Sequence, residues 1–176
     1  MHPGHTYRRI EHERRFLLDC FPSDQTIVRV CRIIDFYIDG TTLRLREQTD
    51  QSGPSLFKLT QKTPAPGDGG RQGYITSIYL TEGEFRVLRQ LPAKKLSKIR
   101  SSVPPFGIDV FQDQLEGLVM AEAEFDSAAD AGDLTIPPFV FREVTTDERF
   151  TGGRLVCASR EELRAWLQEY GIALVP

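Results

Sequence analysis

Charged residues alternate near the start of this 176-residue chain in a pattern suited to binding a metal ion and an anion. Glu11, Glu13 and Arg15 stand two residues apart, directly before an apolar run. On a β-strand this spacing places all three side chains on one face, with the two carboxylates about 7 Å apart. Carboxylate oxygens are preferred ligands of hard cations, and a guanidinium beside them can hold the accompanying anion. The alternative interpretation is an edge strand with a solvated face.

Four later segments also carry pairs of charged residues on one strand face, two residues apart in three of them and four apart in Lys58 and Lys62. Their members are Arg44 and Arg46, Lys58 and Lys62, Lys98 and Arg100, and Glu122 and Glu124. The residues between them are largely apolar, as at Leu45 and Ala123, so each strand has a second face that must be covered. A closed barrel with a polar lumen and a covered exterior satisfies this pattern, and a sandwich with a charged exterior satisfies it equally well.

The elements that must position these side chains are predicted from turns and helix caps. Many short strands, with turn signals between them and two or three helices, indicate a mostly antiparallel α+β domain. Capping boxes at residues 81–84 and 159–162 each predict the start of an amphipathic helix. A strand is predicted over residues 26–34 and a turn over residues 48–55. A flexible loop is predicted over residues 63–70, with the next strand starting at Arg71.

Composition excludes several classes of function. The chain is 40% hydrophobic and 27% charged, and its net charge of -3 argues against non-specific binding to nucleic acid or anionic membranes. No apolar run suggests a signal peptide or a membrane span. The three cysteines, widely spaced and without a Cys-x-x-Cys clip, are interpreted as reduced thiols. We therefore expect a cytoplasmic protein, and the length suits one domain.

Seven segments, taken in order, make the chain similar to the CYTH superfamily, whose members are also called triphosphate tunnel metalloenzymes. They are Glu-x-Glu-x-basic at 11–15, Leu-Arg-Leu-Arg at 43–46, Leu-Thr-Gln-Lys at 59–62, Lys-Ile-Arg at 98–100, Ile-Asp-Val-Phe at 108–111, Ala-Glu-Ala-Glu-Phe at 121–125 and Glu-Val-Thr-Thr-Asp at 143–147. The resemblance implies an eight-stranded antiparallel β-barrel that forms a tunnel, with a few flanking helices. We expect one CYTH-like domain over residues 1–176.

The resemblance also implies a role for each set of charges. The substrate-binding residues would be Arg15, Arg44, Arg46, Lys62, Lys98 and Arg100, which suit the spread-out charge of a triphosphate. The ligands of Mg²⁺ or Mn²⁺ would be Glu11, Glu13, Asp109, Glu122 and Glu124. The catalytic residues would be Lys62, Glu13 and Glu124, with the metal neutralising phosphate charge and activating water. Lys58 is not selected by the resemblance and is interpreted as a solvated lysine. Glu143 either closes the tunnel floor or pairs with an arginine.

The chain departs from the family pattern in three places. Arg15 stands where relatives usually carry Lys, which keeps the charge but changes the donor geometry. Gly73 and Ile75 stand where relatives usually carry two glutamates, a loss that would weaken a second metal site, alter water activation, change the substrate or leave a binder without catalysis. At residues 151–153, Thr-Gly-Gly replaces a Tyr or polar residue followed by Asn.

Three functions follow from this resemblance. The first is metal-dependent hydrolysis of inorganic triphosphate or a triphosphate-bearing metabolite. The second is a class IV adenylate cyclase that forms cyclic AMP from ATP, and the third is a non-catalytic receptor for polyphosphate or nucleotide. A lipid-binding barrel conflicts with the paired charges. The expected partner is a small-molecule triphosphate, with no nucleic acid polymer and no membrane, and the protein is expected to be a monomer or a homodimer.

Overall fold

The computed structural model describes residues 9–51, 53–64 and 72–174 of the chain. Its strands are β1 (Arg9–Leu18), β2 (Arg29–Ile38), β3 (Leu43–Asp50), β4 (Ser55–Pro64), β5 (Gln72–Leu80), β6 (Ala93–Val103), β7 (Phe106–Phe111), β8 (Val119–Phe125) and β9 (Arg142–Glu143). Its helices are α1 (Glu82–Leu88), α2 (Ala128–Gly132), α3 (Gly152–Leu155) and α4 (Arg160–Glu169), with 3-10 helices η1 (Asp113–Leu115) and η2 (Glu148–Phe150). Most of the predicted loop over residues 63–70, and the predicted strand start at Arg71, lie outside the described residues.

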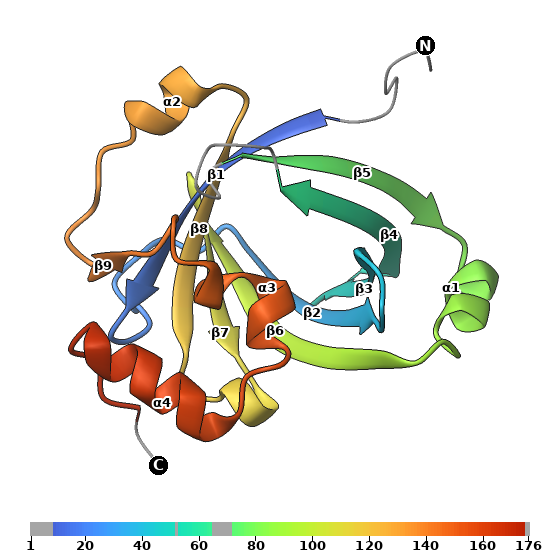
Figure 1. Ribbon diagram of the computed structural model, residues 1–176. Helices are drawn as coiled ribbons and strands as arrows, with labels where there is room; N and C mark the ends of the chain where they lie inside the picture. Colours follow the sequence, from blue (N-terminus) through green and yellow to red (C-terminus); the bar gives the residue numbers. More distant parts are fainter. Residues whose placement is uncertain (1–8, 52, 65–71, 175–176) are drawn as a thin grey trace, which may run out of the picture.

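Eight antiparallel strands close into a barrel, which confirms the predicted α+β tunnel fold (Figure 1). The strand order is β5-β4-β3-β2-β6-β7-β8-β1, and pairing of β1 with β5 closes it. β1 divides its length between neighbours, because residues 9–12 pair with β5 and residues 12–18 pair with β8. β9 pairs with β1 at Phe16 and Leu17, beyond the residues that β5 contacts.

Alternation along each strand decides which side chains face the lumen. On β8, Glu122 and Glu124 line the central cavity, whereas Ala121 and Ala123 are fully buried in a cluster on the opposite face. The same two-residue period holds for the charged residues of the other strands. Of the two architectures compatible with the sequence pattern, the protein therefore adopts the barrel with a polar lumen.

At one end of the barrel the inward faces become apolar. Leu17, Leu96 and Met120 continue the inward faces of β1, β6 and β8, and they belong to one buried cluster. α4 contributes Leu163 and Leu167 to this cluster, both with at most 1% of their surface exposed. The amphipathic C-terminal helix therefore closes this end of the lumen.

The outer face of the barrel is covered at two places. α1 places Phe85 against Phe36 and Phe57, with ring centroids 6.2 and 4.5 Å apart. The segment after α2 places Phe139 against Phe106, with centroids 5.8 Å apart. Each such ring stabilises the fold by roughly 1.5–3 kcal/mol relative to leaving it exposed.

Both predicted capping boxes are present. The side chains of Thr81 and Ser159 each accept a hydrogen bond from the backbone N–H three residues later, and Glu84 and Glu162 reach back to the cap. They begin α1 and α4, as predicted. In the described part of the chain, no helix is long and apolar enough to cross a membrane.

Two strand boundaries differ from prediction. The strand predicted over residues 26–34 is β2, which starts later and runs on through Asp35. The buried carboxylate is tolerated there because Arg46 bonds to it from the neighbouring strand. The turn predicted over residues 48–55 is shorter, since the β3–β4 ladder extends to a pairing of Thr49 with Ser55.

Candidate functional site

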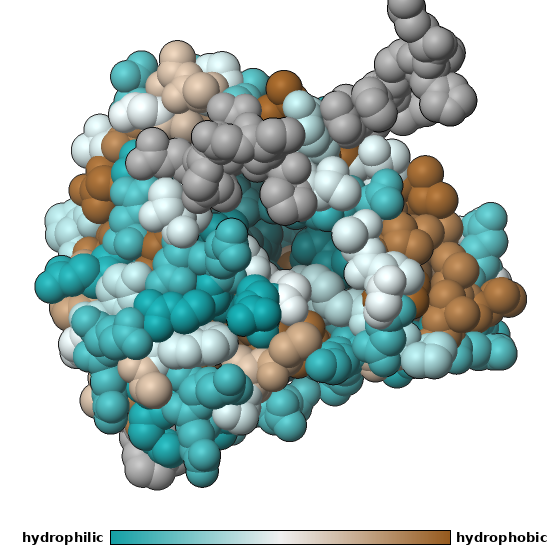
Figure 2. All heavy atoms as spheres, in the orientation of Figure 1, coloured by the Kyte–Doolittle hydropathy of each residue, from teal (hydrophilic) through white to brown (hydrophobic). Residues whose placement is uncertain are grey.

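A cavity of about 690 Å³ occupies the lumen of the barrel. Figure 2 shows a hollow in this face of the molecule, bordered by hydrophilic side chains. Its charged lining residues are Arg9, Glu11, Glu13, Arg15, Arg44, Arg46, Lys58, Lys62, Lys98, Arg100, Glu122, Glu124, Glu148 and Arg154. All the charge pairs identified by two-residue spacing therefore converge on this cavity.

The register of β1 and β8 sets two carboxylates directly opposite each other. Glu13 faces Glu124, and the next inward pair is Arg15 with Glu122. Like charges at opposed positions of an antiparallel ladder repel. Burial raises the pKa of Glu124, and the charges of Glu11 and Glu122 raise it further. The carboxylates of Glu11, Glu13, Glu122 and Glu124 form an acidic wall, which attracts cations.

A basic wall forms in the same way on β3 and β4. Arg46 stands directly opposite Lys58. Burial lowers the pKa of Lys58, and the charges of Arg46 and Arg44 lower it further. Behind this wall lies Asp35, whose pKa would rise on burial but is lowered to about 2 by Arg46 and Arg44. Two cations at opposed positions attract an anion.

Asp109 anchors two further bases from beneath the cavity. Its side chain is fully buried and accepts hydrogen bonds from Lys98 Nζ at 2.5 Å and from Arg100 Nε and Nη2 at 2.7 and 2.6 Å. Arg100 also pairs with Glu122. Burial would raise the pKa of Glu122, but the charges of Lys98 and Arg100 outweigh it and lower that pKa. Asp109 thus positions bases and, unlike the other predicted metal ligands, does not line the cavity.

Lys62 lies between the first two glutamates of the chain. Its Nζ is 2.6 Å from Glu11 Oε2 and 2.9 Å from Glu13 Oε2. The Glu13 contact is a hydrogen bond, whereas the buried Glu11 Oε2 has a charge contact without hydrogen-bond geometry. Burial would lower the pKa of Lys62, but the two carboxylates outweigh it and raise that pKa. Lys62 is therefore a protonated internal cation of the acidic wall.

The acidic wall has the donor chemistry of a Mg²⁺ or Mn²⁺ site. Its carboxylates are hard oxygen ligands, and the buried Glu11 Oε2 lacks a hydrogen-bond donor. Among the described residues, however, no three His, Cys, Asp or Glu side chains converge closely enough to hold an ion. Lys62 pairs with Glu11 and Glu13, and Arg100 pairs with Glu122.

β5 supplies the uncharged wall of the cavity. Its inward residues are Gly73, Ile75, Ser77 and Tyr79. A Cβ atom built on Gly73 would lie 3.2 Å from Cε of Lys62, so the lysine side chain packs against the glycine backbone. No carboxylate enters the lumen from this strand, as the sequence indicates at Gly73 and Ile75.

Tyr37 and Gly152 are in close contact at the cavity wall. A Cβ atom added to Gly152 would lie 2.0 Å from the Tyr37 hydroxyl, so a side chain there requires Tyr37 or α3 to move. Both residues line the cavity. The Thr-Gly-Gly departure at residues 151–153 therefore makes room for a tyrosine.

Sequence reasoning missed Asp35, which lies behind the basic wall, and Tyr37, which lines the cavity, and it did not assign Lys58 to the site. Asp35 and Tyr37 stand two residues apart in an apolar run, a signal that would have placed both on the inner face. The interpretation of Lys58 as a solvated lysine is wrong, because it is half-buried in the cavity wall. Glu143 forms the ion pair that was one of its two interpretations, with Arg14 Nη2 at 2.6 Å.

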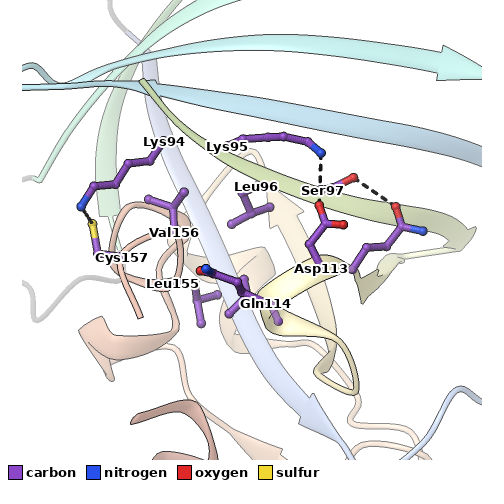
Figure 3. Close-up of a pocket in the computed structure, with 11 residues that line it drawn as sticks. Lys94, Lys95, Leu96, Ser97, Asp113, Gln114, Leu155, Val156 and Cys157 are labelled. Carbon is purple, nitrogen blue, oxygen red and sulfur yellow. Dashed lines mark hydrogen bonds and ion pairs between the residues drawn. The ribbon is translucent and has the colours of Figure 1, made fainter. Parts of the chain in front are cut away.

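A second cavity, of about 470 Å³, lies between β6, η1 and the turn that follows α3 (Figure 3). Lys94 Nζ donates to Cys157 Sγ at 3.2 Å, and Lys95 pairs with Asp113 at the same distance. Lys94 and Lys95 therefore already have partners within this cavity. The lumen is therefore the better candidate for the functional site.

The closed barrel, with acidic and basic walls facing one lumen, defines the protein as a tunnel-forming barrel with a charged interior. No family model matches the chain. The inorganic triphosphatase of Nitrosomonas europaea is 32% identical over 147 residues, which cover 80% of this chain and 92% of that protein. The chain therefore belongs to the CYTH superfamily of triphosphate tunnel metalloenzymes.

Solved structures agree with this assignment. A crystal structure of a hypothetical protein is 28% identical, covers 85% of this chain and 99% of its own, and superposes with a TM-score of 0.54. A crystal structure of an inorganic triphosphatase is 24% identical, covers 84% and 95% respectively, and has the same TM-score. These proteins share the fold of this chain.

Proposed function

We propose that this protein hydrolyses a linear triphosphate in its tunnel and requires Mg²⁺ or Mn²⁺. Its similarity to an inorganic triphosphatase supports the hydrolysis. The observation that carries the proposal is the register, which opposes Glu13 to Glu124 and Arg46 to Lys58 in one lumen. A metal triphosphate brings both a cation and an anion, and so relieves the repulsion within each wall.

The bases of the lumen would bind the phosphate oxygens. Five of the six predicted substrate-binding residues pair with the carboxylates of Glu13, Asp35 and Asp109. The sixth, Lys62, pairs with Glu11 and Glu13. This preorganises the donors before the substrate arrives, so little reorganisation is needed on binding. Arg15 Nε and Arg44 Nε are buried donors without hydrogen-bond partners among the described residues, which fits an incoming anion.

The carboxylates Glu11, Glu13, Glu122 and Glu124 would hold the metal. A bound divalent ion supplies charge neutralisation on the phosphate and a more acidic water. We assign Asp109 to positioning Lys98 and Arg100 instead of binding the ion, because those bases saturate it.

The reaction itself needs a proton acceptor and a cationic donor. A water oxygen attacks the terminal phosphorus, the bond from that phosphorus to its bridging oxygen breaks, and phosphate and pyrophosphate are formed. Glu124, whose pKa is raised by burial and by its acidic neighbours, can take the proton from the attacking water with Glu13 opposite it. Lys62 stays protonated and donates hydrogen bonds to the oxygen on which negative charge develops.

We further propose that the whole chain is one CYTH-like domain acting in the cytoplasm. Its cysteines Cys20, Cys31 and Cys157 are all free, which agrees with a reducing compartment. Inorganic triphosphate is the preferred first substrate to test, because a relative that is 32% identical is an inorganic triphosphatase.

Chromatography of the products formed from inorganic triphosphate and from ATP tests the proposal, with Mg²⁺, with Mn²⁺ and with EDTA. We expect phosphate and pyrophosphate from triphosphate with either ion and no turnover in EDTA. Cyclic AMP from ATP would instead identify a cyclase. Calorimetric binding of triphosphate without turnover would identify a receptor.

A further inference from the structure

Among the described residues, Lys58 differs from the six predicted substrate-binding bases of the lumen, because it has no carboxylate within ion-pair distance. Arg15, Arg44, Arg46, Lys62, Lys98 and Arg100 each lie within ion-pair distance of a carboxylate. Within the described ranges, no carboxylate oxygen lies within 4.0 Å of Lys58 Nζ, although the residue is half-buried and lines the cavity. A half-buried ammonium without a counter-ion is costly, and an anion bound in the cavity would remove that cost.

The surroundings of Lys58 add to this unbalanced positive charge. Arg46 is directly opposite on β3, and Tyr79 is directly opposite on β5. Of these neighbours only Arg46 is charged, and its guanidinium is already joined to Asp35 by hydrogen bonds of 2.6 and 2.8 Å. The pKa of Lys58 is lowered by burial and then by the charges of Arg46 and Arg44, which together outweigh the opposite effect of the more weakly acting carboxylates Glu124 and Asp35.

The position of Lys58 along β4 sets which part of a ligand it can reach. Lys58 and Lys62 share the inward face but are four residues apart, so their Cα atoms are separated by ~13 Å along the strand. Lys62 contacts Glu11 and Glu13 at the acidic wall, where the proposed chemistry takes place. Lys58 therefore lies toward the end of the phosphate-binding row that is away from Glu11 and Glu13.

We propose that Lys58, with Arg46, binds the non-reacting end of the phosphate chain. This inference rests on the proposed function and adds a substrate-binding residue that the resemblance does not select. A contact made equally in the bound substrate and in the transition state changes KM and leaves kcat nearly unaltered. Lys58 is thus a determinant of affinity for a linear polyphosphate.

The test combines calorimetry in EDTA with steady-state phosphate release, using inorganic triphosphate as the ligand. For Lys58→Met we expect a Kd and a KM at least about tenfold higher than wild type, with kcat within about threefold. Lys58→Arg keeps the charge and should recover most of the affinity. Lys95→Met removes an exposed lysine that pairs with Asp113 outside the lumen, and it should match wild type.

The outcomes separate the two proposals. Wild-type protein that neither binds nor hydrolyses triphosphate would refute the proposed function. Wild-type binding combined with a Lys58→Met affinity within twofold of it would refute the role of Lys58 alone. A Lys58→Met variant that loses kcat while KM is unchanged would also refute it, because the residue would then act in the chemical step. Lys58→Gln serves as the neutral variant should Lys58→Met not fold, judged by its thermal midpoint.

Discussion

Asp35 and Arg46 are joined across the β2–β3 ladder by two hydrogen bonds, of 2.6 and 2.8 Å. The Asp35 carboxylate is 1% exposed, and Arg44 Nε lies 3.7 Å from it. This buried bidentate pair fixes the orientation of the basic wall before any substrate is present. It also links the stability of the barrel to the charge of its lumen.

Replacing Asp35 tests that link. We expect Asp35→Asn to lower the free energy of unfolding by about 3 kcal/mol at neutral pH, because buried guanidinium groups lose their charged partner. The folded-state pKa of about 2 lies below the ordinary value of 3.8, so the carboxylate stabilises the protein above that ordinary value and loses its effect as the pH falls toward 2. The difference between wild type and variant in urea unfolding should therefore shrink over that range. A difference that stays constant down to pH 2 would contradict the assignment.

The contact between Tyr37 and Gly152 gives a second prediction. Gly152→Ala should destabilise the protein by about 1–3 kcal/mol, because the new Cβ would lie 2.0 Å from the Tyr37 hydroxyl. Gly153→Ala is the matched control, since its Cβ would meet Tyr37 only at 4.0 Å. Thermal or urea unfolding of both variants measures the difference. Equal stability of the two would show that the close approach is not a constraint.

Lys62 should compete with a divalent ion for the acidic wall. Its ammonium is 2.6 Å from Glu11 and 2.9 Å from Glu13, so Lys62→Met frees Glu11 and one oxygen of Glu13, whose other oxygen stays paired with Arg15. We expect this variant to bind Mn²⁺ at least about tenfold more tightly than wild type in the absence of triphosphate. Lys58→Met removes one positive charge from the same cavity without freeing a carboxylate, and it should show a smaller gain. If calorimetry showed an equal gain in Mn²⁺ affinity for the two variants, the gain would come from the loss of one positive charge and not from the release of carboxylates.

The inner face of most strands could be predicted from sequence, because a period of two residues fixes which side chains share a face. That is why Glu11, Arg44, Lys98 and Glu122 were assigned together and meet in one cavity. The register between strands has no comparable local signal. The opposition of Glu13 to Glu124 depends on where the chain turns and on how the barrel closes.

The sequence also could not predict how deeply each inward-facing side chain lies below the surface of the cavity. Asp109 has the parity of a lumen residue, yet Lys98 and Arg100 cover it, so that it supports bases and does not face the cavity. Asp35 was missed because the residue two positions on, Tyr37, is uncharged, so a search for charged pairs does not include it. The amphipathic stripe of the C-terminal helix was evident, but its packing against Leu17 inside the barrel mouth depends on tertiary contacts.

Phosphate release from inorganic triphosphate by wild type and by Glu122→Gln, with Mg²⁺ or Mn²⁺, tests the central claim most directly. Glu122 lines the lumen, and its low pKa keeps it charged, while Arg100 retains Asp109 as a partner in the variant. We expect wild-type turnover and a loss of at least about a hundredfold in Glu122→Gln, with a similar thermal midpoint. Glu161→Gln, on the exposed face of α4, should match wild type. Unchanged activity in Glu122→Gln would contradict the assignment of the tunnel as the site of triphosphate hydrolysis.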